Sequence, residues 1–131
     1  MATRWADWIR QAGADLALAR HALDGMHHEW ACFAAQQAAE KALKAVHGGR
    51  GQEAWGHSVT ELLASLREEA SGVDEAMLDR GRALDKHYIA TRCPNGLPAG
   101  APADYYTRAE AERAITDAEV ILAWCERELP R

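Results

Sequence analysis

The fold is decided by the stretch Ala34-Ala35-Gln36-Gln37-Ala38-Ala39-Glu40-Lys41-Ala42-Leu43-Lys44-Ala45. Small side chains lie on nearly every side of the helix that it would form, so neighbouring helices can approach closely all round. A helix at the surface does not need this property, whereas a central helix does. We therefore predict a buried central helix that begins near residue 27 or 28 and runs to His47, where Gly48-Gly49 ends it.

The segments on either side of this stretch predict two more helices. Apolar residues recur every three or four positions from Trp5 to Leu23, which indicates an amphipathic helix with Thr3 as its N-cap and Gly25 as its end. After a glycine-rich loop, Ser58-Val59-Thr60-Glu61 is a capping box that opens a short helix, and Ser71-Gly72 ends that helix.

The second half of the chain predicts two long helices separated by a loop. One helix runs from about Asp74 to about Arg92, and Thr107-Arg108-Ala109-Glu110 is a capping box that opens the other. Prolines and glycines between them enforce a loop of roughly twelve residues. No segment alternates like a strand. The predicted fold class is all-α, an up-and-down bundle of four long helices plus one short helix, in a single domain over residues 1–131.

The composition is typical of one cytoplasmic, helical domain. A chain of 131 residues with 48% hydrophobic residues can bury one core. No apolar run approaches the ~20 residues that span a bilayer, and no signal-peptide pattern is present, so we expect a cytoplasmic protein without membrane association. Three distant cysteines argue against a disulfide framework. A net charge of −5 argues against general coating of nucleic acid.

Chemically capable side chains are concentrated in residues 84–96, which end at a proline and an Asn-Gly turn. Residues 80–92 contain four basic residues and a single acid, Asp85. On a helical wheel, Asp85, Tyr88 and Arg92 lie along one side. One interpretation is a ligand pocket in which Arg92 binds a phosphate or carboxylate, Tyr88 stacks or hydrogen-bonds, and Asp85 orients the arginine. The other is an intrahelical ion pair that seats the long loop against the bundle.

Four segments, taken in order, resemble the HEPN family, the nucleotide-binding domains of higher eukaryotes and prokaryotes. They are Cys32 to Lys44, His57 to Leu63, Leu84 to Pro94, and Tyr106-Thr107. Cys93 departs from the family pattern, in which an aromatic residue is expected between the arginine and the proline. The resemblance implies an α-helical bundle, commonly a homodimer, that is often encoded beside a minimal nucleotidyltransferase as a toxin–antitoxin-like pair.

Some members of this family are metal-independent ribonucleases that use an arginine and a histidine separated by a few residues. The resemblance implies that Arg82 and His87 would fill these roles, with Ala83 to Lys86 between them. His87 would act as general acid and base at the 2′-hydroxyl, and Arg82 would clamp the scissile phosphate. On a straight helix the two side chains point about 140° apart. Catalysis would therefore need a kink, or a symmetric dimer that faces two such helices.

Other polar residues carry weaker signals. Lys41 and Lys44 on the central helix could reach the pocket near Arg92, although such lysines are commonly surface residues with buried stems. We include Lys44 among the ligand-binding candidates. His57 is expected to cap or anchor its loop.

No metal site or resident cofactor is expected. His28 and Cys32 are four residues apart, but no second ligand pair follows at a recognisable spacing. Most tryptophans are expected in the core, while Trp5 and Trp55 could supply a dimer interface.

Three functions follow as alternatives. The favoured hypothesis is a small dimeric binding module that holds a nucleotide or other anionic group near Arg92 and acts with a minimal nucleotidyltransferase. The second is a metal-independent endoribonuclease toxin that cleaves RNA with Arg82 and His87. The third is a ligand-free helical adaptor for dimerisation.

Overall fold

The computed structural model describes residues 4–130, and every regular element in this range is helical. The elements are α1 (Arg4–Asp24), α2 (His28–Gly49), α3 (Val59–Leu66), α4 (Glu75–Asp85), α5 (His87–Ala90), the 3₁₀ turn η1 (Pro94–Gly96), α6 (Pro102–Tyr105) and α7 (Arg108–Glu128). The predicted all-α bundle of four long helices plus one short helix is confirmed, with α4 and α5 together as the third long helix. The predicted cap Thr3 lies outside the described residues.

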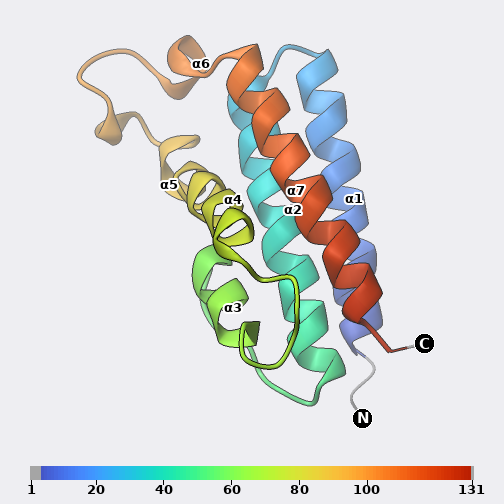
Figure 1. Cartoon of the computed structure of the whole chain (residues 1–131). Helices are drawn as coiled ribbons and strands as arrows, with labels where there is room; N and C mark the ends of the chain where they lie inside the picture. Colours follow the sequence, from blue (N-terminus) through green and yellow to red (C-terminus); the bar gives the residue numbers. More distant parts are fainter. Residues whose placement is uncertain (1–3, 131) are drawn as a thin grey trace.

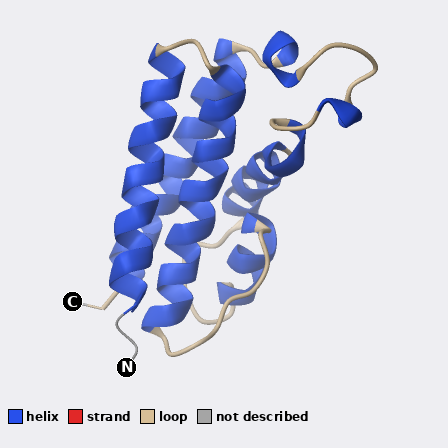
Figure 2. Ribbon diagram, turned by 180° about the vertical axis from the view of Figure 1, so that it is seen from behind, coloured by secondary structure: helices blue, strands red, loops and turns tan. Residues whose placement is uncertain are grey.

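The long helices alternate in direction. Figure 1 shows α1, α2 and α7 side by side, with α1 running opposite to α2 and α7. Helix α4 runs back toward the end of the bundle where α7 begins. Figure 2, from behind, shows α3, α4 and α5 stacked along one flank of the three long helices. No helix within residues 4–130 is long and apolar enough to cross a membrane.

Helix α2 is the centre of the bundle, as its alanine content predicted. It contacts all six of the other α-helices. Ala35, Ala38, Ala39 and Ala42 are fully buried, and a methyl group at each position lets the neighbouring backbones approach closely. One face remains less covered. Its half-buried residues are Phe33, Gln37, Lys41 and Lys44, spaced so that they follow one line along the helix. We call this line the open face of α2.

The segment after α4 differs from its predicted form. The helix expected to continue to about Arg92 is interrupted at Lys86, where the backbone torsions stay helical (φ −62°, ψ −20°), and α5 ends at Ala90. The loop that follows is also less irregular than predicted, because it contains η1 and α6. Arg92 therefore lies beyond the last helical turn rather than on it.

The turn between α3 and α4 is anchored on α7. The buried side chain of Trp124 donates its Nε1–H to the carbonyl oxygen of Ser71 at 3.0 Å. Gly72 follows with a φ of +101°, and the indole occupies the space where a side chain of residue 72 would lie. This contact places α4 and α5 against the bundle.

We expect Gly72→Ala to lower the free energy of unfolding by at least about 2 kcal/mol. A β-carbon there would lie 2.6 Å from Trp124 Nε1, at a φ that side chains rarely adopt. Urea unfolding followed by circular dichroism measures the loss. The control is Gly13→Ala within α1, where a β-carbon meets nothing within 4 Å and stability should rise by about 0.5–1 kcal/mol. Similar effects of both substitutions would contradict the proposed anchor.

Candidate functional site

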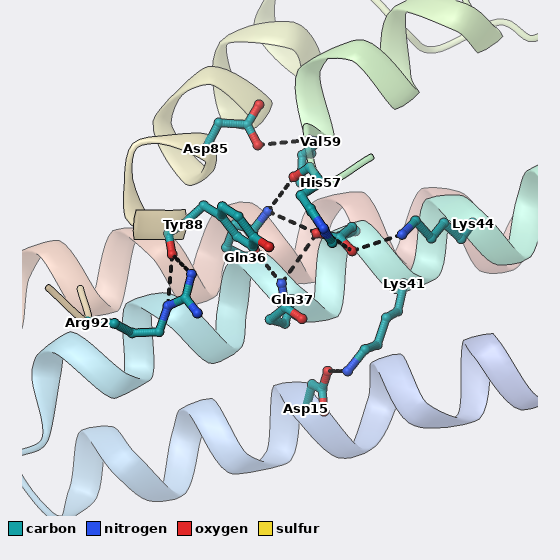
Figure 3. Close-up of polar contacts among 11 residues, drawn as sticks. Asp15, Gln36, Gln37, Lys41, Lys44, His57, Val59, Asp85, Tyr88 and Arg92 are labelled. Atoms are coloured by element: carbon teal, nitrogen blue, oxygen red, sulfur yellow. Dashed lines mark hydrogen bonds and ion pairs between the residues drawn. The ribbon is translucent and has the colours of Figure 1, made fainter. Parts of the chain in front are cut away.

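Asp85, the last residue of α4, caps the start of α3. Its Oδ1 accepts from the Val59 amide at 2.8 Å (Figure 3). Its Oδ2 accepts from the Thr60 amide at 2.9 Å. The hydroxyls of Ser58 and Thr60 donate to Oδ2 at 3.0 and 2.7 Å. The predicted pairing of Asp85 with Arg92, common to both interpretations, is therefore wrong. The physical reason is that the free amides and the positive dipole end of α3 offer this carboxylate four donors at once.

Arg92 instead lies against aromatic rings. The carbon atom at the centre of its guanidinium is 4.3 Å from the centroid of the Phe33 ring and 4.9 Å from that of Tyr88. Its Nε donates to the Tyr88 carbonyl oxygen at 3.0 Å, and one terminal nitrogen donates to the same atom. No carboxylate within residues 4–130 forms an ion pair with it. The arginine is thus held in place while its charge stays available to a ligand.

The rings form a continuous row with this arginine. The His57 ring stacks on Tyr88 with centroids 4.8 Å apart and planes 17° apart, and Tyr88 lies 6.2 Å from Phe33. We call Phe33, His57, Tyr88 and Arg92 the aromatic–arginine cluster. Because three groups already lie against the Tyr88 ring, we infer that Tyr88 would meet a ligand through its hydroxyl rather than through a ring face.

A buried carboxylate connects this cluster to the open face of α2. Glu40 is 3% exposed and Gln36 is fully buried. The Oε2 of Glu40 lies 3.1 Å from Lys44 Nζ and 3.3 Å from His57 Nδ1, and its Oε1 lies 3.3 Å from Gln37 Nε2. Gln36 donates to the carbonyl oxygen of His57 at 2.9 Å. Sequence reasoning missed Glu40, although an acid at a buried position of an alanine-rich helix was a usable signal.

The two lysines of the open face are both ion-paired. Lys44 lies 3.1 Å from Glu40 and 5.5 Å from the centroid of the Trp8 ring, while Lys41 lies 2.6 Å from Asp15 on α1. Lys44 is thus linked to His57 of the aromatic–arginine cluster through Glu40, and its role in ligand binding stays a prediction. Its charge is largely balanced before any ligand arrives.

The tryptophans differ from their expected placement. Within residues 4–130 only Trp124 is buried. Trp8 and Trp30, which were expected in the core, are 36% and 50% exposed, whereas Trp55, expected at a surface, is 81% exposed. Trp5 and Trp55 line, with Trp8 and Lys44, an open cavity of about 460 Å³. Indole rings were expected in the core because of their apolar area, but among the described residues only the Trp124 ring packs there.

Arg82 and His87 are not brought together within one chain. Arg82 is exposed and lies 2.6 Å from Asp79 and 3.2 Å from Glu75. His87 is half-buried, with Nδ1 3.3 Å from the Tyr106 hydroxyl. The two side chains therefore have separate partners, as the helical spacing predicted. Their catalytic role stays a prediction.

The predicted positive patch is smaller than the sequence indicates. Arg80 is paired with Asp117 at 2.7 Å, and Arg82 is paired as described above. Of the four bases in residues 80–92, Lys86 and Arg92 make no ion pair with any residue in the described range. Within residues 4–130, no group of three or more His, Cys, Asp or Glu side chains is placed to hold a metal ion.

Comparison with known proteins gave one family match and several related structures. The HEPN domain model matches residues 5–128. The crystal structure of TT1696 from Thermus thermophilus is 49% identical, with 96% of this chain and 98% of that chain covered and a TM-score of 0.93. An HEPN domain protein from Thermotoga maritima is 40% identical, with coverage of 92% and 95% and a TM-score of 0.75. ST0689, an archaeal HEPN homologue, is 38% identical, with coverage of 98% and 99% and a TM-score of 0.82. No curated protein matched significantly.

Asp85→Ala should lower the free energy of unfolding by about 2–4 kcal/mol, because four donors at the start of α3 lose their acceptor. Hydrogen exchange of the Val59 and Thr60 amides should accelerate, and denaturant unfolding gives the energy. Asp79→Ala, which removes an exposed carboxylate of the same helix, should change stability by no more than about 0.5 kcal/mol. Comparable losses from the two substitutions would show that the Asp85 carboxylate does not stabilise the start of α3.

Burial lowers the pKa of His87 below its ordinary value. The neutral ring is therefore favoured in the folded state, so its stabilising contribution is present above the usual histidine pKa of about 6.5 and is lost as pH falls through the lowered value. We predict that the free energy of unfolding decreases from about pH 7 to about pH 5, and that His87→Gln reduces this decrease. His21→Gln, at an exposed position of α1, should leave it unchanged. An identical pH dependence in the wild type and His87→Gln would contradict the prediction.

Proposed function

The chain belongs to the HEPN domain family, and from this premise we propose that it is a helical module that binds a nucleotide or similar anionic group at the aromatic–arginine cluster. We further propose that it forms a homodimer and acts with a minimal nucleotidyltransferase in a toxin–antitoxin-like pair. One observation carries the binding proposal. An arginine that forms no ion pair with any described residue is held over two aromatic rings beside an open helix face.

The position of Arg92 favours an anionic ligand. A guanidinium carries five N–H donors, and the Tyr88 carbonyl accepts from two of its nitrogens. The remaining donors can form parallel hydrogen bonds with two oxygens of a phosphoryl group. Packing on Phe33 fixes the plane of the guanidinium before binding, so less conformational entropy is lost when the ligand arrives. The Tyr88 hydroxyl has no hydrogen-bond partner within residues 4–130 and offers a further donor.

Aromatic surface for a nucleobase lies beside this arginine. Trp30 is half-exposed, and its ring meets Phe33 edge to face at 6.1 Å. An exposed indole is a typical platform for stacking a base, and both Trp30 and Arg92 contact the Phe33 ring. Lys44 lies further along the open face, and because Glu40 balances its charge, we expect it to contribute a hydrogen bond rather than net attraction.

Exposed apolar side chains support the proposal of a protein partner. Ile89, which follows Tyr88, is 58% exposed, and Trp55 is 81% exposed. Large apolar residues at the surface are typical of interaction sites. A partner that covers Ile89 would come close to a ligand at Arg92, which is the arrangement that transfer of a nucleotidyl group between subunits would need.

The ribonuclease alternative would use the other side of α5. His87 opens onto a cavity of about 220 Å³ that is also lined by two bases, Lys86 and Arg113, and by two acids, Glu110 and Asp117. The charges of this lining balance, so a phosphate there would need a further cation. Arg82 is held by Asp79 and Glu75, so it could complete that site only from a second copy of the chain. The third alternative, a helical adaptor, requires that neither site binds a ligand.

We predict that AMP binds with an affinity that Arg92→Ala lowers by at least about tenfold, or 1.4 kcal/mol. Isothermal titration calorimetry measures the dissociation constants, and circular dichroism checks that each variant is folded. Arg82→Ala is the control, because its guanidinium is already paired, and its affinity for AMP should match that of the wild type. Binding that is lost in Arg82→Ala and His87→Ala but kept in Arg92→Ala would favour the ribonuclease site instead. No binding of AMP at all would favour the adaptor.

A further inference from the structure

Three tryptophans border one cavity at the end of the bundle where α1 begins and α2 ends (Figure 1). The cavity has a volume of about 460 Å³, and Trp5, Trp8 and Trp55 line it. Trp5 packs closely on α2, because a β-carbon at Gly48 would lie only 3.3 Å from the Trp5 Cβ atom. Trp55 comes from the loop before α3 and is 81% exposed. Indole rings from two separate segments therefore border the same space.

One of these indoles already holds a cation of the protein itself. The Nζ atom of Lys44 lies 5.5 Å from the centroid of the Trp8 ring. The negative face of an aromatic ring attracts an ammonium group at this distance, and among the aromatic side chains tryptophan attracts it most strongly. Within residues 4–130, no basic side chain lies over the ring of Trp5 or Trp55. These two indoles are therefore left for a cation from outside.

The charged side chains of the lining leave one carboxylate uncompensated. Lys44 lies 3.1 Å from Glu40, and Arg4 lies 3.5 Å from Asp7, so an acid balances each of these bases. Glu53 also lines the cavity and forms no ion pair with any residue in the described range. This carboxylate would repel an anionic ligand, whereas it would attract a cationic one.

We propose that this cavity is a binding site for an organic cation, an alkylammonium or guanidinium group held by the indoles and Glu53. Such cations are weakly hydrated, so aromatic faces can replace the water that they lose on binding. Trp5 and Trp55 would supply the faces, and Glu53 would supply the compensating charge. The site is independent of the proposed function, because the available charge at Arg92 is positive and selects anions.

Choline tests the proposal, because its quaternary ammonium has no hydrogen to donate and binds through aromatic faces and charge. Its neutral isostere, in which a carbon atom replaces the nitrogen, has the same shape and is the control. Proton–nitrogen NMR follows the five indole N–H groups of the chain separately. We expect choline to shift the signals of Trp5, Trp8 and Trp55 saturably. The signals of Trp30 and Trp124 should stay in place, and neither the isostere nor potassium chloride should shift any of the five.

Variants measure what the ring and the charge contribute. Trp55→Ala should weaken choline binding about three- to tenfold, and Trp55→Phe less, since an aromatic face remains. Tyr105→Ala, which removes another exposed ring, should bind like the wild type. Glu53→Gln should weaken binding about two- to fivefold, and added salt should reduce this difference. Glu68→Gln removes an exposed carboxylate outside the lining and should leave binding unchanged.

A blocked tripeptide with a central arginine separates the two sources of such a cation. Tighter binding of the peptide would support the site as the seat of an arginine side chain of a partner protein, and tighter binding of choline would support a free quaternary ammonium compound. Failure of both to bind, or equal shifts by choline and its isostere, would overturn the inference. Binding that Trp55→Ala and Glu53→Gln both leave unchanged would also overturn it, as would tighter binding of benzoate, an aromatic anion, at the same indoles. Each of these results leaves the binding of AMP at Arg92 to be judged separately.

Discussion

A carboxylate buried in the middle of an alanine-rich helix must find its partners inside the protein, and here that carboxylate is Glu40. The small side chains of α2 let the surrounding helices approach so closely that Glu40 is cut off from water. Lys44, Gln37 and His57 supply the donors that such a buried charge requires. The need to satisfy this charge therefore draws the loop before α3 onto the open face of α2. The candidate site is a direct consequence of how the core is packed.

A second carboxylate, that of Asp85 at the end of α4, binds the start of α3 on the side that faces away from α2. Asp85 binds the backbone and hydroxyls of residues 58–60, while Gln36 and Glu40 bind His57. Residues 57–60, at the start of α3, are thus held between α2 and α4, and the ring of Tyr88 stacks on that of His57. Arg92 then lies over the exposed edge of this assembly. A rigid, partly aromatic surface that carries one available cation is well suited to hold an anionic, planar ligand.

The local features of the fold could be predicted from the sequence, whereas the contacts between distant segments could not. Ser58 and Thr107 cap the helices that they were predicted to cap, because capping depends on residues only three positions apart. The sequence analysis paired Asp85 with Arg92 because a helical wheel relates a residue only to neighbours on the same helix. The observed partners of Asp85 lie about 25 positions earlier in the chain. Glu40 and His57 are 17 positions apart, and no periodicity relates them. The interruption at Lys86, where the torsions stay helical, leaves no residue signature such as glycine or proline.

The crystal structure of the protein with bound AMP tests most directly whether the open face of α2 is the ligand site. The proposed function predicts density for a phosphate within hydrogen-bonding distance of the Arg92 guanidinium, with the base against Trp30. Density for the nucleotide beside His87, with Arg82 of a second copy closing over it, would contradict that assignment.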